Sequence, residues 1–275
     1  MSLVKPTDSF PDKSLIAMIG LRPLPGSPGY GGSIQSIIDR AMEDLQHYKS
    51  AGADAVLLEN SGDLPYIKPP LTDEACRLVE QICSLVRMEY ERPVGLQLLE
   101  AANLQAIQIA AACKLDFIRA EGYVFAHIGG AGLIEGCAGA LLRERKRLRA
   151  DHLRVFADVR KKHCSHALTG DLDLEEHVRQ ADFFHADGII ITGPRTGAEP
   201  DTADLEAAQA ACKLPILIGS GLDPDNMERF FPYADGFIVG STFRRGGAFL
   251  EDLCPERLNR FMDVFQRLKS QPADG

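Results

Sequence analysis

The chain has 275 residues, a formal net charge of −9, and 45% hydrophobic against 25% charged residues. This acidic balance argues against a nucleic-acid partner, and no apolar run reaches the roughly 20 residues that span a bilayer, so we expect no membrane insertion. The N-terminal segment lacks the apolar core of a signal peptide, and the seven cysteines show no CxxC spacing. We therefore expect a reduced, cytoplasmic protein.

Short apolar runs alternate with longer amphipathic stretches along the whole chain. Each run is continuously apolar rather than alternating, which is typical of a parallel strand buried on both faces. Helical spacing of apolar residues follows at 33–50 and 72–88, and acidic first turns begin near 72 and 173. The strand starts lie about 31 residues apart, the size of a βα unit. The predicted strands cover 15–21, 53–59, 93–99, 115–121, 153–159, 187–193, 215–221 and 235–241.

Eight strands that alternate with helices, without a linker or repeat array, predict a single closed (β/α)8 TIM barrel with parallel strands. We assign residues 14–275 to the barrel domain and residues 1–13 to an N-terminal extension. A doubly wound open sheet is the alternative, but the GxGxxG fingerprint that often follows its first strand is absent.

In such barrels the active site lies at the carboxyl ends of the strands. Asp158 ends an apolar strand, where a carboxylate is costly unless it faces the barrel mouth or has a partner. Lys162 and His163 follow and could supply a proton donor, a substrate clamp or that partner. Arg119 and Glu121, at alternate positions of one strand, could pair. The predicted catalytic residues are Glu59, Arg119, Glu121, Asp158, Lys162 and His163, with Gln97 and Thr192 as substrate-binding residues.

The last two predicted strands end in glycine turns, Gly219-Ser220-Gly221 and Gly240-Ser241. Glycine lets the backbone approach an anion, and successive N–H groups in such turns form an anion-binding concavity. We predict that Gly219, Ser220, Gly221, Gly240 and Ser241 bind phosphate. Arg244 and Arg245 either add charge there or begin a solvated helix.

Two loops are candidate lids over the barrel mouth. Residues 21–32 are rich in proline and glycine, and residues 122–139 contain three glycines between positions 129 and 132. Both loops are longer than a minimal turn, so either could fold over a bound ligand; a surface connection is the alternative for the first.

Several segments together resemble the BtpA/SgcQ family. They are residues 23–28 (PLPGSP), 133–136 (LIEG), 157–159 with Lys162-His163, 192–201, 219–221 and 239–241. The resemblance implies a phosphate-binding barrel and links to photosystem I biogenesis or sugar metabolism. Thr196, in the 192–201 segment, is a further predicted substrate-binding residue. The chain departs from the family pattern at Gly20, Ala101, Ala102, Glu121 and Gly130-Ala131. These departures predict either a different substrate or lost catalysis.

Three functions remain open. The first is a non-redox isomerase, lyase or hydrolase acting on a phosphorylated sugar or nucleotide-like metabolite. The second is a non-catalytic assembly or regulatory factor, and the third is an FMN-binding barrel. No motif requires a cofactor or metal, although Glu59, Glu121 and Asp158 could together hold a divalent cation. Phe230-Phe231 or the C-terminal helix (Leu258, Phe261, Phe265 and Leu268) could support a homo-oligomer if they are not buried in the barrel.

Overall fold

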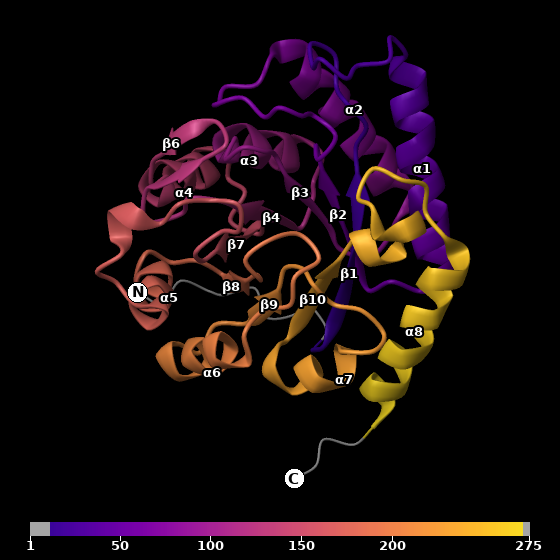
Figure 1. Ribbon diagram of the computed structural model, residues 1–275. Helices are drawn as coiled ribbons and strands as arrows, with labels where there is room; N and C mark the ends of the chain where they lie inside the picture. Colours follow the sequence, from indigo (N-terminus) through magenta and orange to yellow (C-terminus); the bar gives the residue numbers. More distant parts are fainter. Residues whose placement is uncertain (1–11, 272–275) are drawn as a thin grey trace.

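Eight parallel strands close into a barrel in a computed structural model that describes residues 12–271 (Figure 1). Around the barrel the strands follow the order β1-β10-β9-β8-β7-β4-β3-β2, so neighbours in space are neighbours in the chain apart from one inserted hairpin. The predicted (β/α)8 barrel is confirmed. The strands are β1 Ser14–Gly20, β2 Ala55–Glu59, β3 Val94–Gln97, β4 Phe117–Ala120, β7 Arg154–Asp158, β8 Gly188–Ile191, β9 Ile216–Ile218 and β10 Gly236–Val239.

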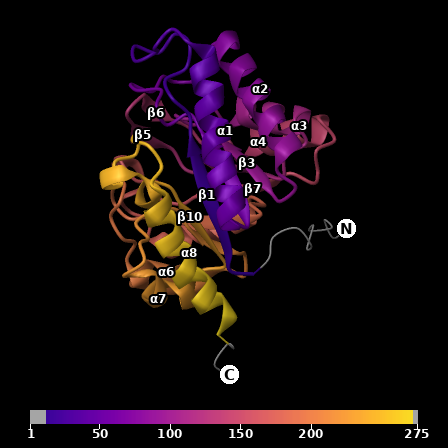
Figure 2. The same cartoon turned by 90° about the vertical axis from the view of Figure 1, so that its right-hand side faces the viewer.

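Helices connect the strands and cover the outside of the barrel (Figures 1 and 2). They are α1 Ile34–Ala51, α2 Asp73–Glu89, α3 Asn103–Ala112, α4 Ala138–Arg147, α5 Leu174–Phe183, α6 Thr202–Ala211, α7 Met227–Phe230 and α8 Pro255–Ser270. Short 3-10 turns occur at Ala167–Thr169, Phe231–Tyr233, Ser241–Phe243 and Arg245–Gly247.

Side-chain caps set the starts of three helices as the sequence predicts. The Thr72 hydroxyl accepts a hydrogen bond from the Ala75 N–H at the start of α2. At the start of α1 the Ser33 hydroxyl accepts from the Ser36 N–H, and at the start of α5 the Asp173 carboxylate accepts from the Glu176 N–H. Helix α8 lies beside α1 (Figure 2) and buries Leu258, Phe261, Phe265 and Leu268 against the barrel. The structure thus places these four side chains in the core. Within the described residues, no helix is both long and apolar enough to cross a membrane.

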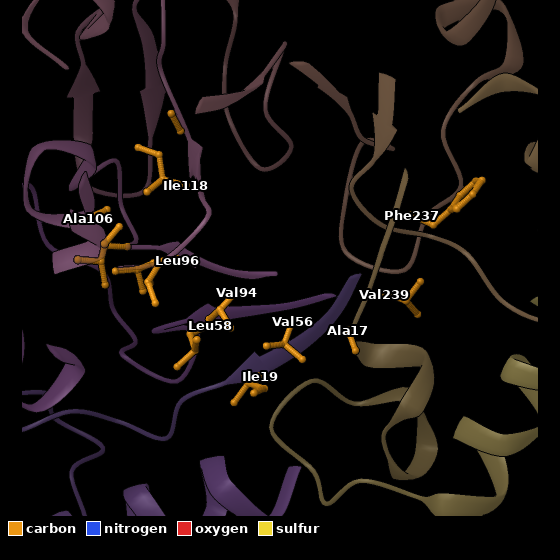
Figure 3. Packing of buried hydrophobic residues seen from close by; sticks show 14 of the residues in the cluster. Ala17, Ile19, Val56, Leu58, Val94, Leu96, Ala106, Ile118, Phe237 and Val239 are labelled. Carbon is orange, nitrogen blue, oxygen red and sulfur yellow. The ribbon is translucent and has the colours of Figure 1, made fainter. Parts of the chain in front are cut away.

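Two apolar clusters hold the barrel together. The larger one fills the space between strands and helices; Figure 3 shows part of it, with side chains such as Ile19, Leu58 and Leu96 from neighbouring strands. The smaller one fills the barrel interior. There, Gly95 leaves room for the Phe117 ring, since a Cβ at residue 95 would stand 2.2 Å from that ring. The interior cluster consists of Ile16, Ala55, Leu57, Phe117, Phe156, Ile190, Leu217 and Ile238.

The interior cluster determines which residues face the mouth. Side chains two residues apart on a strand point to the same side, so the residue two positions after each interior one lies above it. For example, Arg119 follows Phe117 and Asp158 follows Phe156. Applied to these residues and to Gly95, the rule gives a layer at the carboxyl ends of the strands. It consists of Met18, Glu59, Gln97, Arg119, Asp158, Thr192, Gly219 and Gly240.

The 122–139 loop contains an antiparallel hairpin that the sequence did not predict. Strand β5 (His127–Gly129) pairs with β6 (Gly132–Ile134), and Ile128 also forms a bridge with Ser165 in the loop after β7. The hairpin brings Gly130 to the barrel mouth, whereas no residue of loop 21–32 lines the cavity. Of the two predicted lids, only the second therefore reaches the site in this structure.

Candidate functional site

A cavity of about 470 Å³ opens at the carboxyl ends of the strands. Its volume lies in the range of small-molecule sites. The structure brings most of the sequence-predicted site residues together around it, while Asp158 and Thr192 do not line it. The predicted residues on its wall are Glu59, Gln97, Arg119, Glu121, Lys162, His163, Thr196, Gly219, Ser220, Gly221, Gly240 and Ser241.

Arg119 and Asp158 form a buried ion pair in the floor. The Arg119 Nε and Nη2 donate to the two Asp158 carboxylate oxygens at 2.8 and 2.9 Å, and the Asp158 side chain is fully buried. Burial opposes the charge on Arg119, but the Asp158 carboxylate outweighs it and raises the pKa of the guanidinium. The sequence left a pair between Arg119 and Glu121 open, but Arg119 pairs with Asp158 instead. Both carboxylate oxygens of Asp158 bind Arg119, so we infer that Asp158 positions the Arg119 side chain.

Lys161 is the centre of a second buried network. Its Nζ lies 2.8 Å from Glu100 Oε1 and 3.0 Å from Glu121 Oε2. Burial, partly offset by Lys161, raises the pKa of Glu121 to about 7. Burial acts the same way on Glu100, but hydrogen bonds from Lys161 and from the N–H groups of Ala131 and Gly130 hold its pKa below the ordinary value. Glu121 therefore titrates near neutral pH beside a fixed cation.

This network contains several of the positions that are predicted from the sequence to differ from the family pattern. Ala101 donates its N–H to Glu121 Oε2 at 3.1 Å, and Ala131 and Gly130 donate theirs to Glu100 at 2.6 and 3.3 Å. Ala101, Glu121, Gly130 and Ala131 thus contact one another through an ion-pair network that also holds the β5–β6 hairpin.

Lys162 and Glu59 line the cavity without a fixed partner. Neither side chain has a hydrogen-bond or ion-pair partner among residues 12–271, although Glu59 is buried and Lys162 is partly buried. Burial and the nearby Arg119 guanidinium lower the pKa of Lys162 to about 8. An ammonium and a carboxylate left unpaired at a cavity wall are available to a ligand.

The unpaired charge of Lys162 predicts a stability effect with a definite pH dependence. The folded pKa near 8 lies below the ordinary 10.5, so the unfolded chain binds more protons between these values and wild-type stability rises with pH across that window. Lys162→Met removes the buried charge. We expect it to be more stable than wild type at pH 7, with the difference vanishing above about pH 10.

Urea unfolding of both proteins at pH 7, 8.5 and 10 measures this difference. Lys146→Met is the matched control, because Lys146 is an exposed surface residue and its replacement should give no pH-dependent difference. A Lys162→Met protein that is less stable than wild type at pH 7 would show that Lys162 has a compensating partner.

His163 and Thr196 join the loops after β7 and β8. The His163 Nε2 lies 3.0 Å from Thr196 Oγ1 and 3.1 Å from the Thr196 N–H. The nitrogen that accepts from this N–H is unprotonated, which agrees with the lowered pKa of His163. Thr192 lines an adjacent pocket, and Lys162 and His163 line both that pocket and the main cavity. The buried Thr192 hydroxyl has no hydrogen-bond partner within the described chain.

The loop after β9 offers free hydrogen-bond donors. Within the described part of the chain, the N–H groups of Ser220 and Gly221 donate to no acceptor and the buried Ser220 hydroxyl has no partner. Only glycine fits at positions 219 and 221. A Cβ at residue 219 would stand 2.7 Å from the Thr192 side chain. Residue 221 has a φ of +81°, and a Cβ there would stand 2.1 Å from the Ala198 carbonyl oxygen. Ser220 and Gly221 both line the cavity, so these donors are open to an anionic ligand.

Arg244 does not belong to this anion site and does not begin a solvated helix. It is buried, and its Nη1 donates to Asp44 of α1 at 2.9 Å. The pair fastens the loop after β10 to the outer helices, whereas Arg245 is exposed.

No set of three or more His, Cys, Asp or Glu side chains in residues 12–271 is arranged to hold a metal ion. The possible cation site at Glu59, Glu121 and Asp158 is not assembled, because Asp158 binds Arg119 and Glu121 binds Lys161. All seven cysteines are free thiols, and none forms a disulfide.

Sequence reasoning assigned no role to Lys161, Glu100, Tyr66 or Phe249. Lys161 lies in the basic run before His163, and Glu100 follows the third predicted strand by one residue. Both could have been predicted from their position at the carboxyl end of a strand. Tyr66 and Phe249 also line the cavity, but they come from long loops where no sequence pattern indicates a direction.

Comparison with known proteins places the chain in a family. The model of the BtpA family matches residues 11–267. A Pyrococcus abyssi protein described as uncharacterized is 39% identical over 259 residues, covering 94% of this chain and 98% of that one. The photosystem I biogenesis protein BtpA of Synechocystis is 33% identical over 267 residues, covering 94% and 90%.

Solved structures with a similar fold are distant in sequence. The 3-hexulose-6-phosphate synthase of Salmonella typhimurium has a TM-score of 0.59 at 12% identity, covering 93% of this chain and 99% of that one. The orotidine 5′-monophosphate decarboxylase of Methanocaldococcus jannaschii has a TM-score of 0.57 at 14% identity, with the same coverage. At these identities the likeness shows the barrel fold alone. The family model and the close relatives show that the chain belongs to the BtpA family.

Proposed function

We propose that this protein is an enzyme acting on a phosphorylated small metabolite, whose phosphate binds at the loops after β9 and β10. The observation that carries the proposal is the set of unused donors there: the N–H groups of Ser220 and Gly221 and the buried Ser220 hydroxyl. A phosphate monoester would satisfy all three. Several proteins of similar fold are named for phosphorylated compounds, which supports the choice of ligand.

The opposite side of the cavity supplies acid–base groups. Glu121 has a pKa near 7 and Lys162 near 8, so each can give or take a proton at neutral pH. Glu59 adds an unpaired carboxylate, and Arg119 is held by Asp158. This set suits isomerisation, bond cleavage or hydrolysis without a redox step. A cytoplasmic location belongs to the same proposal and fits the free thiols.

A thermal-shift titration with inorganic phosphate and ribose 5-phosphate tests the proposal. A ligand at 100 times its dissociation constant stabilises by about 2.7 kcal/mol, which raises the melting temperature by about 5 °C or more. Ser220→Asp places a negative charge at the donors and should abolish the shift. Ser36→Asp, the same change on the exposed first turn of α1, should leave it intact.

If neither phosphate compound stabilises a folded wild type, the phosphate site is refuted. If Ser220→Asp responds as wild type does, the phosphate binds elsewhere.

A non-catalytic assembly role is the second candidate, because the Synechocystis relative is named as a photosystem I biogenesis protein. It predicts that ligand binding occurs without turnover. Exhaustive turnover assays with the best-stabilising ligand would separate the two, since the enzyme proposal requires product that disappears in Lys162→Met.

A further inference from the structure

We propose that the cavity binds a phosphate monoester that carries a heteroaromatic ring, with the ring against Tyr66 and Phe249 and one of its N–H groups donating to Gln97. This inference rests on the proposed function, because it assumes that the phosphate occupies the loop at Ser220. It adds the chemical class of the rest of the ligand.

Two aromatic side chains reach the mouth of the cavity from different loops. Tyr66, from the loop between β2 and α2, donates its hydroxyl to the Ser61 carbonyl at 3.0 Å. Phe249, from the loop between β10 and α8, lies over Gly20, whose Cβ position is 3.5 Å from the Phe249 ring and 3.0 Å from Ser61 Oγ. Both rings line the cavity. The glycine at position 20 thus leaves space that Phe249 occupies.

The wall beside these rings is apolar. Met18, Leu99 and Leu222 line the same cavity, and Leu64 stands at its rim with 51% of its surface exposed. The hydroxyl groups of a bare sugar would lose water against this wall without gaining partners, which is unfavourable. A flat ring would instead cover apolar surface and stack on an aromatic neighbour.

Gln97 specifies a polar edge on the ring. Its Nε2 donates to Glu121 Oε1 at 2.9 Å, which fixes the orientation of the amide. Its Oε1 is then turned away from Glu121 and, although buried, has no donor anywhere in the described chain; the residue is 1% exposed. Because Gln97 lines the cavity, the missing donor is one that a ligand can bring. An N–H at the edge of a heteroaromatic ring supplies it beside the apolar wall.

Calorimetric titration of the full chain tests this class. The ligands are ribose 5-phosphate, which lacks a ring, and uridine 5′-monophosphate, AMP and FMN, which carry one. At least one ring-bearing ligand should bind tenfold or more tightly than ribose 5-phosphate. The order among the three distinguishes a nucleotide from a flavin as the source of the ring.

Phe249→Leu keeps an apolar side chain but removes the ring. It should erase most of the preference and leave the affinity for ribose 5-phosphate unchanged. Phe183→Ala is the control, because Phe183 is 73% exposed and lines a different groove, so the preference should persist. Circular dichroism would confirm that both variants fold.

Two outcomes overturn the inference while the proposed function stands: ribose 5-phosphate binding as tightly as every ring-bearing ligand, or Phe249→Leu keeping the full preference. The proposed function fails separately if uridine and adenosine bind as tightly as their monophosphates, because the phosphate would then contribute nothing.

Discussion

Arg119→Met is expected to destabilise the protein by about 3–5 kcal/mol, because it leaves the fully buried Asp158 carboxylate without its cation. The two charges lie in the floor of the cavity and make two hydrogen bonds to each other. Much of the loss should return in the double variant Arg119→Met/Asp158→Leu, since an apolar pair can replace a buried ion pair at little cost. Urea unfolding of wild type, both single variants and the double variant gives the coupling energy.

A coupling energy near zero would contradict this account of the floor. It would mean that other groups stabilise each charge independently.

Lys161→Met should lower the free energy of unfolding by a similar amount, about 3–5 kcal/mol at pH 8. It leaves the buried carboxylates of Glu100 and Glu121 without their cation. Burial already raises the pKa of Glu121, and without Lys161 it should rise further. The pKa of Glu100, which Lys161 helps to hold below its ordinary value, should rise as well. A carboxyl group whose pKa is higher in the folded than in the unfolded protein favours folding while it is protonated. Its contribution is therefore present at low pH and lost as the pH rises. The variant should therefore suffer less at pH 5 than at pH 8.

Denaturation of wild type and Lys161→Met at both pH values measures the effect. Adding Glu121→Gln to Lys161→Met removes one of the two unpaired carboxylates. The difference in stability loss between pH 5 and pH 8 should then become smaller. A destabilisation that is equal at pH 5 and pH 8 would show that Glu100 and Glu121 do not depend on Lys161 for their charge.

The strands and the floor of the site could be predicted because both follow from local pattern. Continuously apolar runs identified all eight barrel strands, and the two-residue repeat of a strand places Glu59, Gln97 and Arg119 above the interior cluster. The glycines after β9 and β10 were visible for the same reason, since they end strands whose directions were already fixed.

Partners on different strands could not be predicted, because they depend on which strands are neighbours, on their register and on loop conformation. Arg119 meets Asp158 39 positions away, and Lys161 meets Glu100 61 positions away. The β5–β6 hairpin has strands of three residues, too short to show a pattern, yet it supplies the N–H groups that hold Glu100. Tyr66 and Phe249 reach the cavity from irregular loops.

The central claim is that phosphate binds the unused donors of the loop after β9. The most direct measurement is a titration of the 15N-labelled protein with inorganic phosphate, followed by amide chemical shifts. The account predicts saturable shifts concentrated at Ser220 and Gly221, with smaller ones at Gly240 and Ser241, and none of them in Ser220→Asp. Saturable shifts confined to exposed lysine and arginine positions, with Ser220 and Gly221 unmoved, would contradict it.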